Sequence, residues 1–190
     1  YKVNGVKCML MTVSAFLSLG YLGLIDPTRI YDKFAEILAS TNMFALIFCS
    51  LLAFKGRNFP SSSDSGSTGN ALTDFYWGTE LHPRILGWDV KQFIACRFGM
   101  MFWSVGPAAF AWKQYDVYGK VSDSMVVSVV LQLVYVLKFY LWETGYFCSL
   151  DMQHDRAGYH ILWGCLVWVP CMYTSTAFYL ASHPIDLGWS

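Results

Sequence analysis

Long apolar segments constrain this chain more than any other feature of its sequence. A bilayer core about 30 Å thick needs roughly 20 mostly apolar residues per helix. The candidate segments are residues 6–25, 37–54, 98–112, 121–142 and 159–181. Helices satisfy their own backbone hydrogen bonds, as a lipid environment demands. We therefore predict an all-α fold, a polytopic integral membrane helical bundle with about five spans.

The third segment and its surroundings are the least regular stretch of this pattern. Residues 98–112 are few for a span and hold Gly106 and Pro107 at their middle. This predicts either a kinked span or a half-span packed against protein rather than lipid. A polar loop is predicted for residues 55–97, which include a solvated Ser/Gly-rich stretch at 60–70.

Composition excludes several classes of protein. Only 14% of residues are charged, against about 25% in an ordinary soluble domain. Net charge is zero with no basic block, so no nucleic-acid partner is expected. The scattered cysteines predict neither a metal site nor a disulfide framework, and no glycine-rich phosphate motif is present. Because the chain begins with Tyr1 rather than Met, we expect residues 1–190 to be a single, incomplete membrane domain.

Ionisable residues are concentrated directly after the fourth predicted span. Glu143 opens this segment, and Asp151, His154 and Asp155 follow at positions i, i+3 and i+4, which share one face if the segment is helical. A carboxyl group beside a histidine can hold a proton ready for donation. The alternative is a solvated helix end, ion-paired with the adjacent Arg156. Spacing alone leaves both interpretations open.

A second cluster, residues 74–84, combines aromatic and charged side chains. Tyr76 lies among further aromatic residues, and Glu80 and Arg84 follow within the same stretch. Such a loop is suited to the mouth of a ligand site. It is equally typical of an interfacial aromatic belt with charges that bind lipid headgroups.

These clusters carry a resemblance to a known family. Residues 69–84 (GNALTDFYWGTELHPR) resemble the signature of the membrane sterol reductases, which include the delta-14 and delta-24(28) reductases and lamin B receptor. That signature ends in Asn-Pro-Arg, where this chain has His82, Pro83 and Arg84. Thr73 stands where Tyr or His is usual, whereas the Asp-Phe-aromatic-x-Gly spacing is retained.

Further motifs, in the same order along essentially the whole chain, resemble the plant-type delta-7 branch of this family, the 7-dehydrocholesterol reductase type. They are SSSDSG at 61–66, CRFGMM at 96–101, GKVSDSM at 119–125, HDRAG at 154–158 and WGCLVWVP at 163–170. Lys138 stands where animal members tend to have an acid, which also favours the plant-type branch.

The resemblance implies reduction of the C7–C8 double bond of a delta-5,7 sterol with NADPH, in the endoplasmic reticulum membrane. The residues expected to carry the chemistry are Glu143, Asp151, His154 and Asp155, with Tyr76 and Glu80 as secondary candidates. Family members continue well past this point, so we expect the NADPH-binding residues mostly C-terminal to this chain and expect the chain alone to be inactive. A sterol substrate and membrane lipid are the expected partners.

Three other functions remain open from the sequence. A delta-14 sterol reductase would share the fold and cofactor, and product analysis separates the two activities. A non-catalytic sterol-binding membrane protein or scaffold belongs to a different class. A transporter would favour paired repeats and broken helices, for which Gly106 and Pro107 are the only indication.

Overall fold

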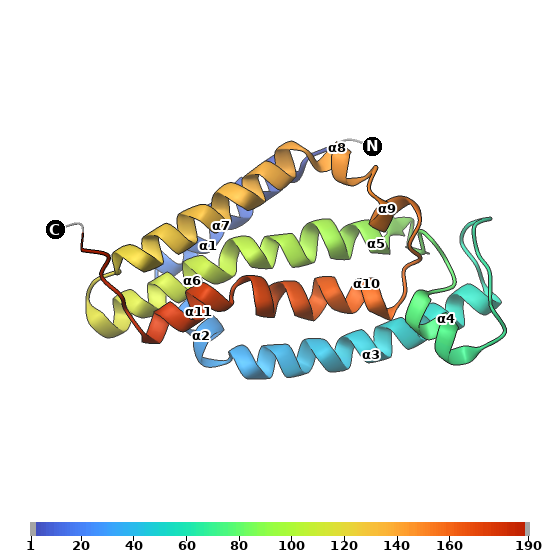
Figure 1. The fold of residues 1–190 in the computed structure, drawn as a ribbon, viewed down its shortest axis with the longest axis horizontal. Coiled ribbons are helices and arrows are strands. Elements are labelled where there is room, and N and C mark those ends of the chain that lie inside the picture. The colour runs from blue at the N-terminus through green and yellow to red at the C-terminus, as the bar shows by residue number, and fades with distance from the viewer. Residues whose placement is uncertain (1–2, 189–190) are drawn as a thin grey trace.

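The computed structural model describes residues 3–188 and folds them into a helical bundle with one small hairpin (Figure 1). The elements are α1 Gly5–Tyr21, α2 Thr28–Asp32, α3 Phe34–Asn58, α4 Ala71–Trp77, β1 Arg84–Ile85, β2 Trp88–Asp89, α5 Val90–Phe93, η1 Ile94–Gly99, α6 Met100–Tyr118, α7 Asp123–Leu141, α8 Glu143–Tyr146, α9 Leu150–Gln153, α10 Tyr159–Trp163, η2 Gly164–Tyr173 and α11 Ser175–Ser182. The prediction of an all-α membrane fold is confirmed.

Within residues 3–188, 4 helical stretches are long and apolar enough to cross a membrane. They are Phe34–Asn58, Val90–Tyr118, Asp123–Leu141 and Tyr159–Ser182. The predicted span at 6–25 corresponds to α1, which is shorter at 17 residues. The chain leaves this helix through Gly23, whose φ of +68° suits glycine at a helix end.

The third span differs most from its prediction. Instead of a segment confined to 98–112, the structure has a continuous helical stretch of 29 residues, Val90–Tyr118. It begins early because the Asp89 side chain caps it, accepting a hydrogen bond from the Gln92 N–H at 2.9 Å. Pro107 lies inside α6 without ending it.

The polar connection between the second and third spans is correspondingly shorter than predicted. Helix α3 continues to Asn58 and the next span starts at Val90, so the connection covers residues 59–89 rather than 55–97. It contains α4 and the antiparallel hairpin β1–β2, in which Arg84 pairs with Asp89.

Two π-helical segments, η1 and η2, interrupt the regular helices near the centre of the bundle. They pack directly on each other: a Cβ atom on Gly99 would lie 2.7 Å from the carbonyl oxygen of Cys165. Pro170 lies inside η2. Such widened turns are frequent at functional sites. The contact joins the helical stretches Val90–Tyr118 and Tyr159–Ser182 in the core.

The stretch Val90–Tyr118 forms the centre of the bundle. Of the apolar 18-residue segment within this stretch, 56% is buried inside the bundle, against 17% of the corresponding segments of α3 and α7. Figure 1 shows α6 between α7 and α1 on one side and α10, α11 and then α3 on the other. The outer surface of α7 is apolar, with exposed Val126, Val130, Leu131 and Val134. An apolar exposed face of this kind suits lipid as its surroundings.

One end of the bundle is closed by a cluster of packed aromatic rings. Phe34 at the start of α3 packs on Phe178 and Phe110, with ring centroids 4.8 and 5.4 Å apart. The polar connections gather at the opposite end, where Figure 1 shows α4, α5, α8 and α9. All six candidate residues therefore belong to this second end.

Candidate functional site

The two predicted clusters meet where the chain crosses itself at Gly78 and Gly158. A Cβ atom on Gly158 would lie 2.3 Å from the backbone carbonyl carbon of Trp77, so any larger residue would force the backbone to shift. The Ala157 N–H donates to the carbonyl oxygen of Glu80 at 2.9 Å. The crossing joins the connection after α4 to the segment before α10.

Glu80 anchors the first cluster to the end of α3. Its side chain is buried and accepts hydrogen bonds from Lys55 Nζ at 2.8 Å and from the Ser61 N–H and Oγ at 2.5 and 2.6 Å. Burial acts to raise the pKa of this carboxyl, but the hydrogen bonds from Lys55 and Ser61 outweigh it, so the pKa of Glu80 is lowered. Its oxygens therefore act as acceptors that hold the loop in place.

Asp74 has a similar anchoring role at the end of α3, and sequence reasoning missed it. Arg57 donates from Nη2 at 2.7 Å, Ser67 Oγ at 2.5 Å and the Thr68 N–H at 2.8 Å. Burial raises the pKa of Asp74, but these hydrogen bonds outweigh it and hold the pKa well below its ordinary value. The Ser/Gly-rich stretch predicted as a solvated loop thus partly wraps a buried carboxylate.

Glu143 lies in a separate place, at the junction of three elements. It is fully buried, forms an ion pair with Arg97 of η1, and accepts from the Gly5 N–H at 3.1 Å. Arg97 in turn donates from Nη2 to the Asn4 side chain at 2.8 Å. Arg97 was not among the predicted site residues, although it belongs to one of the motifs that carry the resemblance.

Asp151, His154 and Asp155 do not share a helix face. Helix α9 ends at Gln153, so the helical condition behind that prediction is not met. Asp151 and His154 are exposed, and Asp155 is half-buried. These side chains are open to water at the end of the bundle.

Lys91 is a buried lysine that holds the same segment against the central helix. Its side chain is inaccessible, and Nζ donates to the carbonyl oxygens of Met152, at 3.2 Å, and Asp155. A lysine in a stretch predicted as a polar loop gives no sequence signal for this role, because its partners are backbone carbonyls.

Tyr76 packs on the surface of the crossing. Its ring lies 5.5 Å from that of His160, between centroids. Its carbonyl oxygen lies 2.9 Å from His160 Nδ1, which must donate because a carbonyl only accepts. The side chain is half-exposed.

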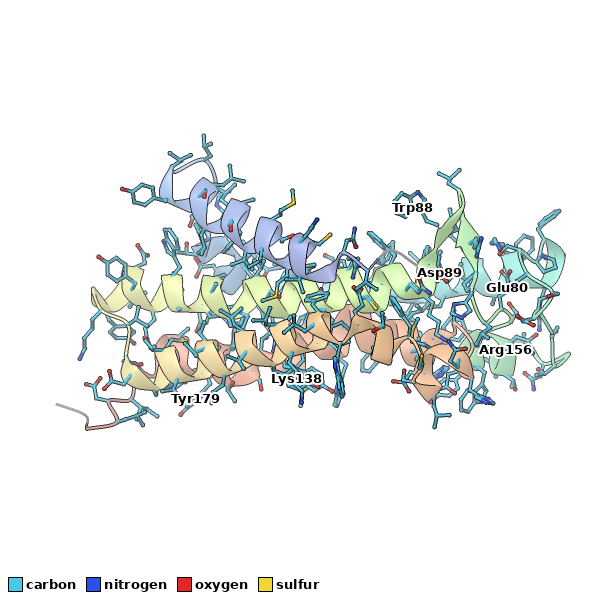
Figure 2. All side chains as sticks on the ribbon, turned by 90° about the horizontal axis from the view of Figure 1, so that it is seen from above. Glu80, Trp88, Asp89, Lys138, Arg156 and Tyr179 are labelled. Atoms are coloured by element: carbon cyan, nitrogen blue, oxygen red, sulfur yellow. The ribbon has the colours of Figure 1, made fainter. Side chains whose placement is uncertain are left out.

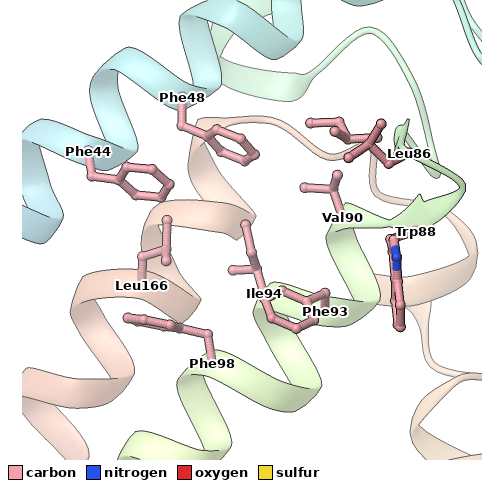
Figure 3. A pocket seen from close by; sticks show the side chains of 10 residues that line it. Phe44, Phe48, Leu86, Trp88, Val90, Phe93, Ile94, Phe98 and Leu166 are labelled. Carbon is pink, nitrogen blue, oxygen red and sulfur yellow. The ribbon is translucent and has the colours of Figure 1, made fainter.

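An apolar cavity of 530 Å³ lies between α3, η1 and η2 beneath the hairpin. Figure 3 shows side chains from these elements pointing into it. Its lining residues are Phe44, Phe48, Ile85, Leu86, Trp88, Val90, Phe93, Ile94, Phe98 and Leu166. Ligand pockets are typically about 300–1,000 Å³ and mostly apolar, so this cavity has a suitable size and character.

A polar cavity of 600 Å³ adjoins it, because Trp88 and Phe93 line both. Charged and amide side chains line this second cavity: Asn4, Arg84, Asp89, Gln92, Arg97 and Glu143. The pair formed by Arg97 and Glu143 thus faces a space large enough for a ligand group.

The hairpin β1–β2 stands between the two cavities. His82 Nδ1 lies 2.9 Å from Asp89 Oδ2 at its base. Leu86 at the tip is 95% exposed, with a φ of +51°. Figure 2 shows Trp88 and Asp89 at the same end of the molecule as Glu80 and Arg156.

The six candidates therefore occupy different places rather than one site. Glu143 lines the polar cavity, and the other five line neither of the two cavities. Within residues 3–188, no group of His, Cys, Asp and Glu side chains is arranged to hold a metal ion.

Comparison with known proteins identifies the family. The profile of the "Ergosterol biosynthesis ERG4/ERG24 family" matches residues 1–190. The chain is 51% identical to the 7-dehydrocholesterol reductase of Arabidopsis thaliana, over 99% of this chain and 44% of that protein. It is 36% identical to the 7-dehydrocholesterol reductase of Danio rerio (99% and 40%) and 34% identical to the Delta(14)-sterol reductase of Methylotuvimicrobium alcaliphilum (98% and 43%). The chain spans less than half the length of these relatives. It belongs to the ergosterol biosynthesis ERG4/ERG24 family.

Proposed function

We propose that the full-length protein reduces the C7–C8 double bond of delta-5,7 sterols, with NADPH as hydride donor, in the endoplasmic reticulum membrane. The observation that carries this proposal is the 51% identity to a 7-dehydrocholesterol reductase over 99% of the chain. Identity to the delta-14 sterol reductases of M. alcaliphilum and Schizosaccharomyces pombe is 34% and 36%. A multi-pass membrane fold suits a substrate that is dissolved in lipid.

Reduction of the C7–C8 double bond requires a proton at one carbon and a hydride at the other. NADPH supplies the hydride when it is bound. Within the described residues, the arginines beside glycine-rich loops are already engaged, Arg57 by Asp74 and Arg156 by the carbonyl oxygen of Gly66. These residues do not fit the diphosphate of a dinucleotide, and the cofactor site is expected mostly C-terminal to residue 190.

The six candidate residues differ in how well each could serve as the proton donor. A donor has to regain its proton from water in every turnover, which favours the water-accessible Asp151, His154, Asp155 and Tyr76. We assign Glu80 to the structure of the loop, because its carboxylate accepts hydrogen bonds from Lys55 and Ser61. Glu143 is fully buried and accepts hydrogen bonds from Arg97 and the Gly5 N–H, which argues against proton donation.

The proposal is tested by expressing the full-length protein in yeast that accumulates delta-5,7 sterols, followed by sterol profiling with mass spectrometry. Delta-5 sterols without the C7 double bond are expected as products. The protein itself is expected in the endoplasmic reticulum fractions. An unchanged profile with the protein present in the membrane would refute delta-7 reduction. A parallel strain that accumulates delta-14 sterols tests the alternative activity, and failure of both would leave sterol binding without chemistry.

The proton donor is tested in the same strain with conservative variants. Asp151→Asn, Asp155→Asn and Tyr76→Phe each remove a proton-bearing group from this end of the molecule while retaining its approximate size. General acid catalysis typically contributes about 100- to 10,000-fold, so loss of the donor should lower turnover by at least about 100-fold. A variant with wild-type turnover removes its residue from the list.

A further inference from the structure

We propose that the hairpin β1–β2 and the apolar cavity beneath it form an intramolecular docking surface, which a segment outside residues 1–190 covers in the full-length protein. We call this surface the hairpin groove; its residues are those that line the cavity of 530 Å³. The chain spans only 44%, 40% and 43% of three relatives, so more than half of such a protein is available to cover the groove. The inference does not depend on the reaction that the protein catalyses.

The hairpin groove exposes large apolar side chains that lie next to one another. Leu86 is 95% exposed and Trp88 73% exposed, and Phe44 and Phe93 are also exposed. All four line the same cavity, and Figure 3 shows them around one space between α3, the hairpin and the start of the central span. Single exposed apolar residues are normal, whereas a contiguous apolar patch marks a contact surface. Water is therefore a poor covering for the groove.

The tip of the hairpin carries backbone groups that are unpaired in this part of the protein. Ile85 pairs with Trp88, so Leu86 and Gly87 form the turn between them. Within residues 3–188, neither the N–H nor the carbonyl group of these two turn residues takes part in a hydrogen bond. Non-helical backbone is tolerated at membrane depth only where protein or a water-filled space surrounds it. A covering of lipid would therefore suit the side chains of the groove but not the tip.

Leu86 also adopts a backbone conformation that is unfavourable for a leucine. Its φ of +51° lies in the left-handed region, and it is the one non-glycine residue among residues 3–188 with a positive φ. Two-residue hairpin turns that need positive φ at both positions usually contain Asn-Gly or Asp-Gly. Gly87, with a φ of +81°, fits this pattern, whereas Leu86 does not. Burial of the leucine side chain in a contact would offset both its conformation and its exposure.

A protein segment supplies both kinds of contact that the hairpin groove needs. Its side chains can fill the apolar cavity, and its polar groups can pair with the backbone at Leu86 and Gly87. A sterol has an apolar body but a single hydroxyl group, so it would satisfy the cavity and leave most of the tip unpaired. A segment of the same protein is favoured over a second copy, because its attachment gives it a high effective concentration at the groove.

The test is site-specific photocrosslinking in the full-length protein, in lipid nanodiscs that contain no sterol. The photoreactive residue p-benzoylphenylalanine takes the place of Leu86, whose exposure leaves room for the larger ring in this part of the protein. Peptide mapping by mass spectrometry should find a crosslink within one copy, to a peptide outside residues 1–190. Adducts with lipid alone, no adduct, a crosslink confined to residues 1–190, or a crosslink between two copies would each overturn the proposal.

Leu131 provides the matched control position. It is an exposed leucine on the outer face of α7, where the same photoreactive residue should form adducts with lipid. A crosslink from both positions to the same peptide, in similar yield, would overturn the assignment of the contact to the hairpin groove.

The sign of a stability change gives an independent check. Asparagine tolerates a positive φ better than leucine does, so Leu86→Asn should raise the unfolding temperature, or leave it unchanged, if water surrounds the tip. If a protein segment covers the tip, loss of the buried leucine outweighs this gain. We expect Leu86→Asn to lower the unfolding temperature of the full-length protein by at least about 1 °C in detergent without sterol. An unchanged or raised temperature would overturn the docking surface.

Discussion

Replacement of Gly158 by alanine tests the crossing that joins the two motif segments. The added Cβ atom would lie 2.3 Å from backbone atoms of both Gly78 and Trp77. Backbone held by hydrogen bonds cannot move aside as the end of a flexible side chain does. Gly158 itself has an ordinary negative φ of −101°, so the expected cost is steric alone.

The magnitude follows from overpacking, which costs about 1–3 kcal/mol in a well-packed site. For a chain of 150–250 residues, 1 kcal/mol shifts the unfolding temperature by about 2–4 °C, and the shift is about half as large in a protein of twice that length, such as the relatives of this chain. Gly158→Ala should therefore lower that temperature by about 1–6 °C in the full-length protein, measured in detergent by intrinsic fluorescence.

The matched control is Gly164→Ala. This glycine is helical and has no atom within 4 Å of the site of a new Cβ atom, so the same substitution should leave the unfolding temperature unchanged or raise it slightly. Equal unfolding temperatures for the two variants would refute the crossing as described. A large loss in Gly164→Ala would instead show that the widened segment η2 does not tolerate a methyl group.

Further predictions concern buried charges at the same end of the molecule. Because the pKa of Asp74 is lowered by folding, its stabilisation is present above the ordinary aspartate value of about 3.9 and is lost as pH falls below it. Asp74→Asn should therefore lower stability at pH 6 and flatten its decline between pH 6 and 3, as measured by thermal unfolding at each pH; an unchanged slope would contradict this role. Lys91→Met should leave the carbonyl oxygens of Met152 and Asp155 without their donor, at about 1–3 kcal/mol for a buried unpaired group. Hydrogen exchange should then increase in residues 150–157 and remain unchanged in α7, and equal protection in the variant would refute the anchoring role.

The long helices could be predicted from the sequence because apolar length alone specifies them. The segment predicted at 121–142 forms α7 at Asp123–Leu141, and that predicted at 159–181 ends within one residue of its limit in the structure. The start at Val90 could not be predicted in this way. It depends on a cap from Asp89 and on burial of charged Lys91, which hydropathy counts against a span.

The candidate site was less predictable, because its contacts join residues far apart in the chain. The motif segments could be found by resemblance, but their sequences do not show that the chain crosses itself at Gly78 and Gly158. Glu143 was identified as a candidate, whereas its partner Arg97, 46 residues away, was not. The charge density of the segment 143–156 also indicated Asp151 and Asp155, which the structure leaves exposed and half-buried.

The buried charged side chains of the described residues are paired within the protein. Asp74 and Glu80 are surrounded by donors from α3 and the loop, and Lys91 is taken up by backbone carbonyls. Each of these groups has a structural partner and lines neither cavity. The pair formed by Arg97 and Glu143 is different, because it borders a space beside an apolar cavity. The Gly5 N–H and the Asn4 side chain add hydrogen bonds to Glu143 and Arg97 respectively, and these offset the cost of burying the pair.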